Sequence, residues 1–139
     1  MKKVVLVGGC FDLLHYGHIK FLKEAKKYGD YLVIALESDE NVRRMKGDSR
    51  PIHTQPKRKE MLEAVSVVDE VISLPPMTTD LEYADLVKRI KPHIIAVAEG
   101  DPIVDKKKQH AQTVGAQLVT IPKIPTPSTS QLAKLLGLE

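Results

Sequence analysis

The sequence predicts an α/β domain of the doubly wound class, built on a mainly parallel sheet of five strands. Short runs rich in Val, Ile and Leu alternate with stretches of helical periodicity, which is the pattern of successive βαβ units. The 139 residues contain no repeat and no linker-like segment, so we expect a single domain over residues 1–139. The first apolar run does not alternate with polar residues, as is typical of a strand buried on both faces of a sheet.

The first predicted elements are two strands, each followed by a helix. The strand over residues 4–7 leads through a Gly-Gly-Cys turn into a helix over residues 18–27, whose apolar residues lie at helical spacing opposite its lysines. Gly29 ends this helix. Residues 31–36 form the second strand, and Ser38 caps a short helix after it.

The remaining elements repeat this alternation after one loop. Residues 46–55 combine Gly, Asp, Ser and Pro without a period, so we expect a loop there. The elements that follow are a helix over 56–65, a strand over 70–74, a helix over 80–90, a strand over 94–98, a lysine-rich helix near 105–114, a strand over 118–121 and a short helix over 129–136. Because ligands bind beyond the carboxyl ends of parallel strands, the loops after the first, second and fourth strands are the expected place for chemistry.

The composition favours a small anionic ligand over nucleic acid or a membrane. A net charge of +3 and a pI of about 8.9 form a mild basic bias, and stacking residues for single strands are scarce with no Trp and two Phe. No apolar run approaches membrane-spanning length. The single cysteine cannot form an internal disulfide, and the N-terminal stretch lacks a signal-peptide cleavage site, so we expect a cytoplasmic protein.

Two histidines mark the turn between the first strand and the first helix. His15 and His18 are three residues apart and straddle Gly17 at the start of the helix, so their side chains can converge. Gly17 allows a bulky ligand to approach the backbone. The free N–H groups and the positive dipole end of the helix add an anion site at the same place. This combination predicts a cradle for a triphosphate.

The residues alone leave two other interpretations of the histidines. They could be surface residues at a helix start, or a metal pair completed by Cys10. Zinc sites usually need a third and a fourth spaced ligand, and His53, His93 and His110 do not show such spacing. We therefore expect no metal site built from protein ligands alone.

The ten residues from Gly9 to His18 read GCFDLLHYGH and resemble the G-x-F-D-x-x-H-x-G-H signature of the cytidylyltransferase-like nucleotidyltransferases. The resemblance implies a Rossmann-like nucleotidyltransferase fold. It also implies transfer of a nucleoside monophosphate from ATP or CTP to a phosphorylated small molecule, with release of pyrophosphate. The nucleotide-binding residues implied in this segment are Gly9, Cys10, Phe11, His15, Gly17 and His18, and Asp12 is a candidate for binding the acceptor substrate.

The resemblance assigns catalytic roles to His15 and His18, which would stabilise charge at the α-phosphorus during in-line attack. Because the acceptor is already a phosphate anion, the reaction needs no general base. Cys10 could be a nucleophile, but no base is implied beside it and direct displacement needs none. We interpret Cys10 as a small residue whose backbone approaches the nucleotide.

Two basic segments also match relatives of this family. Residues 43–51, RRMKGDSRP, look like the loop after the second strand in the adenylyltransferase domain of heptose-phosphate enzymes, which makes Lys46 a catalytic phosphate ligand on a flexible loop that closes over the substrate. Arg50 in the same loop is a candidate for acceptor binding. Arg58 stands where relatives carry an arginine at a helix start, and a guanidinium suits phosphate. A plain solvated basic surface is the alternative for both segments.

The resemblance continues to the end of the chain. Asp101 matches an acidic position that contacts the base or ribose in relatives, although a simple turn would also explain it, and Glu99 stands where heptose enzymes have glycine. Ser128 and Thr129 resemble a Ser-Thr-Thr element that holds the triphosphate, and Ser128 is also a good helix cap.

These matches imply a reaction class and leave the substrate open. The residue 43–51 segment favours ATP over CTP and a sugar phosphate as acceptor, with Mg²⁺ bound to the nucleoside triphosphate. Glycerol-3-phosphate cytidylyltransferase and archaeal FAD synthase share the motif and are the alternatives. A nucleotide-binding sensor without catalysis is the alternative outside enzymes. By analogy with similar enzymes we expect a homodimer.

Overall fold

The parallel sheet is the frame on which the rest of the chain is arranged. The computed structural model describes residues 2–125 and 129–138, and its five strands pair in the order β3-β2-β1-β4-β5, with every pairing parallel. The strands are β1 (Val4–Gly9), β2 (Tyr31–Leu36), β3 (Glu70–Ser73), β4 (Ile94–Ala98) and β5 (Gln117–Ile121). The predicted doubly wound sheet is confirmed. The chain winds from β1 outward to β3 and then returns to β4 on the other side, so the strand order reverses beside β1.

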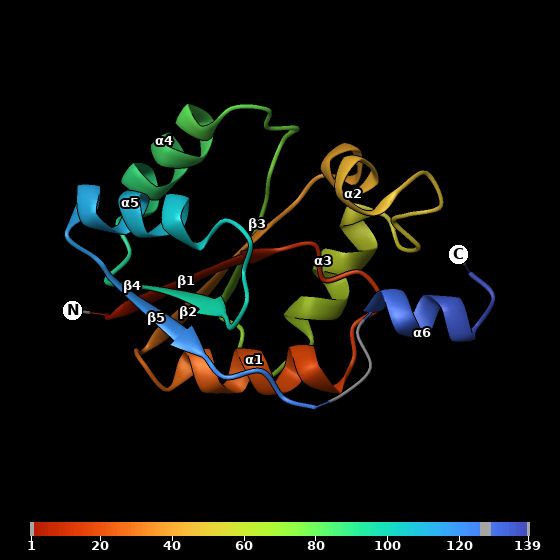
Figure 1. Cartoon of the computed structure of the whole chain (residues 1–139). Coiled ribbons are helices and arrows are strands. Elements are labelled where there is room, and N and C mark those ends of the chain that lie inside the picture. The colour runs from red at the N-terminus through yellow and green to blue at the C-terminus, as the bar shows by residue number, and fades with distance from the viewer. Residues whose placement is uncertain (1, 126–128, 139) are drawn as a thin grey trace.

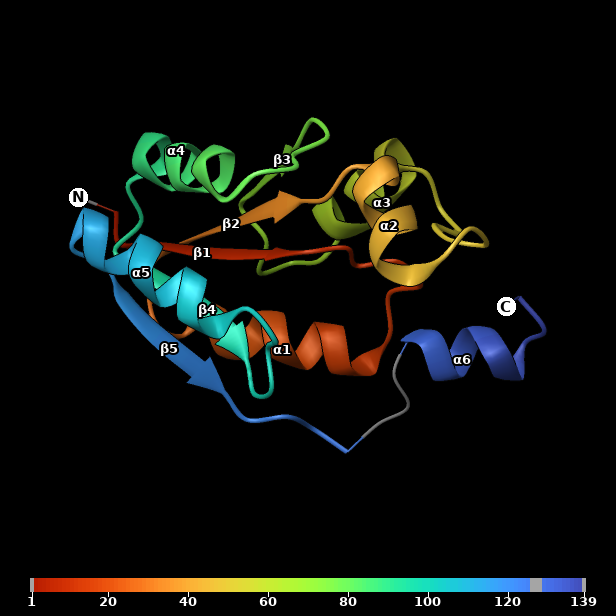
Figure 2. The same cartoon turned by 45° about the horizontal axis from the view of Figure 1, so that its top comes forward.

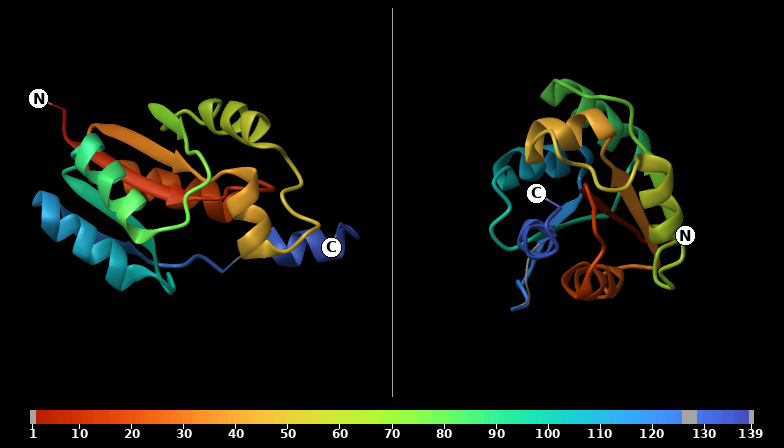
Figure 3. Two further views of the ribbon diagram at one scale, coloured as in Figure 1. Left: turned by 90° about the horizontal axis from the view of Figure 1, so that it is seen from above. Right: turned by 90° about the vertical axis from the view of Figure 1, so that its right-hand side faces the viewer.

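Helices cover both faces of the sheet (Figures 1 and 3). One face carries α1 (Tyr16–Lys26) and α3 (Gln55–Glu63), and the other carries α4 (Asp80–Ile90) and α5 (Val104–Val114). Successive residues of β1 point to opposite faces. Val5 and Val7 therefore pack with Leu22 of α1, whereas Leu6 packs with Leu86 of α4. This burial on both faces explains the continuous apolar run of the first strand.

Two short helices lie beyond the carboxyl ends of the strands. They are α2 (Asp39–Lys46) and α6 (Thr129–Leu135), and Figure 2 shows both on the side toward which the strands run. The loops that follow β1 and β4 lie at the same carboxyl edge of the sheet. Because the strand order reverses between these two strands, this edge is the crevice in which α/β sheets bind ligands.

Two predicted boundaries are wrong for physical reasons. The first helix begins at Tyr16 rather than at residue 18, because the side chain of His15 serves as its cap. Lys46 was expected in a loop but is the last residue of α2. The predicted Ser38 cap is confirmed, since its hydroxyl accepts the N–H of Asn41 at 3.1 Å, and the helix then continues until Gly47 ends it with a φ of 107°.

Gly29 is needed for a reason other than the predicted helix end. The helix α1 already ends at Lys26, and Lys27 follows in right-handed conformation. A Cβ atom at Gly29 would lie 2.5 Å from the carbonyl oxygen of Lys3, which is backbone and cannot move aside. The glycine therefore lets the chain pass close to β1 as it enters β2.

Candidate active site

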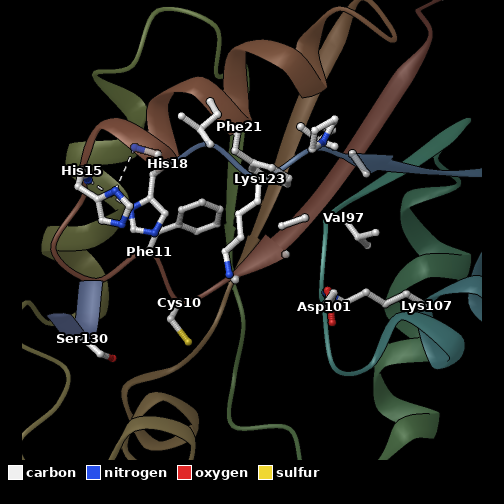
Figure 4. Close-up of a pocket in the computed structure, with 18 of the residues that line it drawn as sticks. Cys10, Phe11, His15, His18, Phe21, Val97, Asp101, Lys107, Lys123 and Ser130 are labelled. Carbon is white, nitrogen blue, oxygen red and sulfur yellow. Dashed lines mark hydrogen bonds and ion pairs between the residues drawn. The ribbon is translucent and has the colours of Figure 1, made fainter. Parts of the chain in front are cut away.

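A cavity of about 410 Å³ opens at the carboxyl end of the sheet, between β1 and β4 (Figure 4). Its walls come from the loop after β1, α1, the last residue of α2, the ends of β4 and β5, and residues of α5 and α6. Most residues that the sequence predicted for the site lie in these walls: Gly9, Cys10, Phe11, His15, Gly17, His18, Lys46 and Asp101. The structure thus brings together side chains from distant parts of the chain.

His15 and His18 cap the start of α1 with their own side chains. Nδ1 of His15 accepts the backbone N–H of Gly17 at 3.0 Å, and Nδ1 of His18 accepts the backbone N–H of His15 at 3.2 Å. The two rings stack with their centroids 3.9 Å apart, so the predicted convergence is confirmed. Two backbone N–H groups at the helix start, those of His15 and Gly17, therefore donate to the imidazoles.

This cap determines which ring nitrogen carries the proton. A neutral imidazole has one N–H, and because Nδ1 accepts in both rings, the proton of each neutral ring is on Nε2. Burial lowers the pKa of His15. Burial, and then the nearby charges of His15 and Lys46, lower the pKa of His18 to about 4. Both rings are therefore predominantly neutral near pH 7, with Nε2–H as their donor group.

The loop before the histidines has an unusual backbone. Phe11 has a φ of 48° and Leu13 a φ of 54°, both in the left-handed region, which costs a residue with a side chain about 1–2 kcal/mol. The ring of Phe11 is held in the core and lies 5.4 Å from that of His18. A strained loop of this kind persists only where its surroundings fix it in place.

Three predicted site residues do not line the cavity: Asp12 within this loop, and Arg50 and Arg58 bonded to it. Asp12, Arg50 and Arg58 are each 1% exposed. Nε of Arg50 donates to the carboxylate of Asp12 at 2.7 Å, and Arg58 donates to the carbonyl oxygen of Cys10 at 2.8 Å. Asp12 and Arg50 were expected to bind the acceptor, and Arg58 the nucleotide. In this structure their charged groups have partners inside the protein, as buried charges require.

The cavity wall has an excess of positive charge. Lys46, Lys107 and Lys123 line it, and the acidic residue among its described lining residues is Asp101. The carboxylate of Asp101 accepts from Nζ of Lys107 at 2.6 Å and from the backbone N–H of Ile103 at 2.9 Å. Three lysines and one aspartate leave two positive charges, which attract a polyanion into a low-dielectric cleft.

Lys107 and Lys123 line the cavity but were not predicted from the sequence. Lys123 follows the end of β5, and Figure 4 shows its side chain reaching across the cavity toward the loop after β1. The loop after the fifth strand begins at the same sheet edge as the loops after the first and fourth strands. This position was the sequence signal that could have predicted Lys123 as a site residue. The carboxylate of Glu99 accepts the backbone N–H of Lys123 at 3.2 Å, so Glu99 helps to place this segment.

The predicted hydroxyl element is described only in part. Ser128 lies outside the described residues, and Thr129 is the first residue of α6. The next residue, Ser130, lines the cavity.

The environment of Cys10 keeps its thiol neutral. Burial raises the pKa of Cys10, although Lys46 acts against that shift. Its Sγ lies 3.8 Å from Sδ of Met45. Because the thiolate is the reactive form, this environment does not favour a cysteine nucleophile.

A model of the cytidylyltransferase-like family matches residues 6–129. The chain belongs to this family. This membership is what the motif from Gly9 to His18 implied. Within the parts of the chain that the structure describes, no helix is long and apolar enough to span a membrane.

Two relatives of this chain differ in how much of their own length it matches. Bifunctional protein HldE of Aliarcobacter butzleri is 38% identical over 133 residues, which are 96% of this chain and 26% of that protein. FAD synthase of Thermococcus kodakarensis is 39% identical over 141 residues, which are 97% of this chain and 91% of that enzyme. The chain therefore spans about a quarter of the HldE relative and nearly all of the FAD synthase.

A solved structure supports the same fold. The crystal structure of the lipopolysaccharide core biosynthesis protein from Thermoplasma volcanium aligns with a TM-score of 0.72 and 26% identity, covering 89% of this chain and 98% of that one. The fold is therefore the Rossmann-like nucleotidyltransferase fold.

Proposed function

We propose that this nucleotidyltransferase transfers the adenylyl group of ATP to a phosphorylated small molecule and releases pyrophosphate. The observation that supports this most is the neutral histidine pair, which shares one cavity with Lys46, Lys107 and Lys123. A triphosphate needs positive charge along its length and a donor at the phosphorus where charge develops, and this cavity offers both.

The transfer is a single displacement. An oxygen of the acceptor phosphate attacks the α-phosphorus and forms a new P–O bond, while the bond from the α-phosphorus to the oxygen that bridges to the β-phosphorus breaks. Pyrophosphate leaves with the electron pair of that bond. The Nε2–H groups of His15 and His18 stabilise the charge that develops on the α-phosphate, and the lysines neutralise the leaving pyrophosphate. No protein group has to take a proton from a phosphate anion.

We propose that Mg²⁺ arrives with the triphosphate. Magnesium is usually held by substrate phosphates and one or two carboxylates. Among the described residues no cluster of three or more His, Cys, Asp or Glu side chains could hold a metal. Asp101 is the carboxylate of the cavity wall, and Lys107 already pairs with it. This donor set fits an ion carried by the phosphate oxygens, where Mg²⁺ would offset the charge of the triphosphate.

The first candidate acceptor is a sugar phosphate. Residues 43–51 resemble the corresponding segment of heptose-phosphate adenylyltransferases, and the structure places the end of α2 in the cavity wall. The likeness to HldE over almost the whole of this chain supports this choice.

The second candidate acceptor is flavin mononucleotide. The observation in its favour is coverage, because this chain matches 91% of the length of the FAD synthase relative but 26% of the HldE relative. ATP is the donor in both candidate reactions, so this alternative changes the acceptor and keeps the chemistry.

A panel of substrates tests the proposal. The protein is incubated with Mg²⁺, with ATP or CTP, and with a heptose phosphate, glycerol 3-phosphate or flavin mononucleotide, and pyrophosphate release is followed. We expect turnover with ATP and a heptose phosphate. Turnover with CTP and glycerol phosphate would overturn the donor and the acceptor, and turnover with flavin mononucleotide would select the second candidate. Tight ATP binding without release with any acceptor would favour a sensor.

A further inference from the structure

Two buried arginines contact the loop that leads to the histidines. Arg50 and Arg58 are among the largest side chains that solvent does not reach, and neither lines the cavity. A guanidinium is always charged, so removing it from water is costly unless it is paired and hydrogen-bonded. The hydrogen-bond partners of these two arginines therefore show which segments of the chain the arginines hold in place.

Arg58 connects three segments through one guanidinium. It donates to the carbonyl oxygen of Cys10 at 2.8 Å, to that of His53 at 3.0 Å and to the carboxylate of Asp39 at 2.7 Å. Cys10 begins the strained loop, and Asp39 is the first residue of α2. The planar fork of Arg58 thus ties the loop after β1 to the start of α2.

Arg50 and Asp12 make the matching connection after the other end of α2. The carboxylate of Asp12 accepts from Nε of Arg50 at 2.7 Å and from the backbone N–H groups of Ile52 and His53 at 2.7 and 3.0 Å. These hydrogen bonds, together with Arg50, hold the pKa of Asp12 below its usual value against the opposing effect of burial. Asp12 lies between the two left-handed residues, Phe11 and Leu13. The three groups that donate to Asp12 therefore hold the loop between its two left-handed residues.

We propose that Arg50 and Arg58 are positioning residues that hold Lys46 and the histidine pair as one rigid unit. The helix α2 ends at Lys46 and is bonded to the loop through Asp39, its first residue, and through Arg50, which follows its end. Lys46 therefore keeps a fixed position relative to His15 and His18. This differs from the expected lysine on a flexible loop that closes over the substrate. This inference rests on the proposed function for its catalytic consequence, whereas the rigid unit itself can be observed without turnover.

Two substitutions break the unit from its two ends. Arg58→Lys keeps the charge, but an ammonium cannot reach three acceptors in the geometry of a guanidinium. Asp12→Asn keeps the size, but its amide group cannot accept from three donors at once. The control is Arg89→Lys, at an exposed position of α4 away from the loop.

The state of the histidine rings is the first readout. Nitrogen NMR of the folded protein reports which ring nitrogen carries the proton, and His15 and His18 are expected as Nε2–H tautomers. We expect both signals to change in Arg58→Lys and Asp12→Asn but not in the control. Nδ1 of His93 accepts the N–H of Val4 at 3.0 Å, at the far end of the sheet, so its signal is an internal reference that should not move.

Kinetics supply the second readout. Misplacing catalytic groups by a fraction of an ångström to 1 Å lowers turnover by about ten- to a hundredfold. We expect kcat to fall by that factor in both variants, with a much smaller change in the KM for ATP. A large rise in KM with unchanged kcat would make Arg58 a nucleotide ligand and overturn the proposal. Unchanged ring signals in both folded variants would also overturn it.

Hydrogen exchange of the unsubstituted protein gives a test that does not depend on the variants folding. The amides of His15, Gly17, Ile52 and His53 all donate within the proposed unit. If the unit is rigid, these amides exchange through one shared opening and have equal free energies of opening. Exchange of the Ile52 and His53 amides that is orders of magnitude faster than that of His15 and Gly17 would contradict it. None of this requires nucleotidyl transfer, so the rigid unit can hold even if the proposed function fails.

Discussion

At the scale of single residues, the two imidazoles act as a helix cap and as hydrogen-bond donors at once. Nδ1 of each ring accepts a backbone N–H, so a neutral ring has its proton on Nε2. Adding a second proton at Nδ1 would break the cap. The same interactions that start α1 therefore keep the histidines in the form that can donate to a phosphate near pH 7.

Replacing either histidine by asparagine separates these two tasks. An asparagine side chain can still accept a backbone N–H at a helix start, but it lacks the Nε2–H group in the same place. We expect His15→Asn and His18→Asn each to lower kcat by roughly a hundredfold or more, with thermal unfolding little changed. The control is His110→Asn, since His110 pairs with Asp80 at 2.9 Å outside the cavity walls. Near-normal kcat in both histidine variants would remove their catalytic assignment.

The pKa of His18 also predicts how stability depends on pH. The folded protein holds this pKa at about 4, below the value of 6.5 for an unperturbed histidine. Between these values the unfolded chain binds more protons, so the free energy of unfolding falls as the pH drops from 6.5 toward 4. The contribution is complete above pH 6.5 and is up to about 3 kcal/mol. Urea unfolding across this range should show a slope that His18→Asn reduces, and an equal slope in both proteins would disprove this origin.

At the scale of elements, the sequence predicted those parts that depend on local pattern. The apolar run of β1 and the Ser38 cap are local signals, and both are confirmed. The cap by His15 was missed because histidine is not among the usual capping residues. Lys46 was placed in a loop because Gly and Pro follow it, although α2 continues to that residue. The sequence also could not predict the burial of Arg58, whose partners include a carbonyl group 48 residues away.

Lys46 is fixed at the end of α2, and a substitution there can show whether it serves catalysis or the binding of ATP. A lysine held beside the reacting phosphates should contribute mainly in the transition state. We therefore expect Lys46→Ala to lower kcat by a larger factor than it raises the dissociation constant for ATP, as measured by kinetics and calorimetry on one preparation. Arg43→Ala is the matched control, because Arg43 is exposed on the same helix and does not line the cavity. A large loss of affinity with unchanged kcat would show that Lys46 serves binding.

At the scale of the whole molecule, the candidate site residues lie together at the carboxyl edge of the sheet. The loops after β1 and β4, the end of α2 and the segment after β5 meet around one cavity, although they are far apart in the chain. The topology made the location of this cavity predictable, since ligands bind where the strand order reverses. The positions of Lys107 and Lys123 in the cavity wall depend on how α5 and the segment after β5 pack, which no local sequence pattern shows.

We propose that the protein acts in the cytoplasm as a homodimer. This extends what the family resemblance implies, and Leu135 of α6 and Leu136 directly after it are exposed apolar residues at 78% and 68%. Sedimentation equilibrium over a range of concentrations should give twice the chain mass of 15.5 kDa. A monomer at the concentration used in the activity assay would contradict this prediction.

In the proposed reaction the α-phosphate of a nucleoside triphosphate is joined to a phosphorylated acceptor. The most direct measurement follows ATP labelled at the α-phosphorus, with Mg²⁺ and the acceptor that the substrate panel selects. We expect the label to appear in a product joined to the acceptor through a new phosphoanhydride, with unlabelled pyrophosphate in equal amount. Label found only in ADP, with orthophosphate released or the terminal phosphate passed to the acceptor, would contradict it.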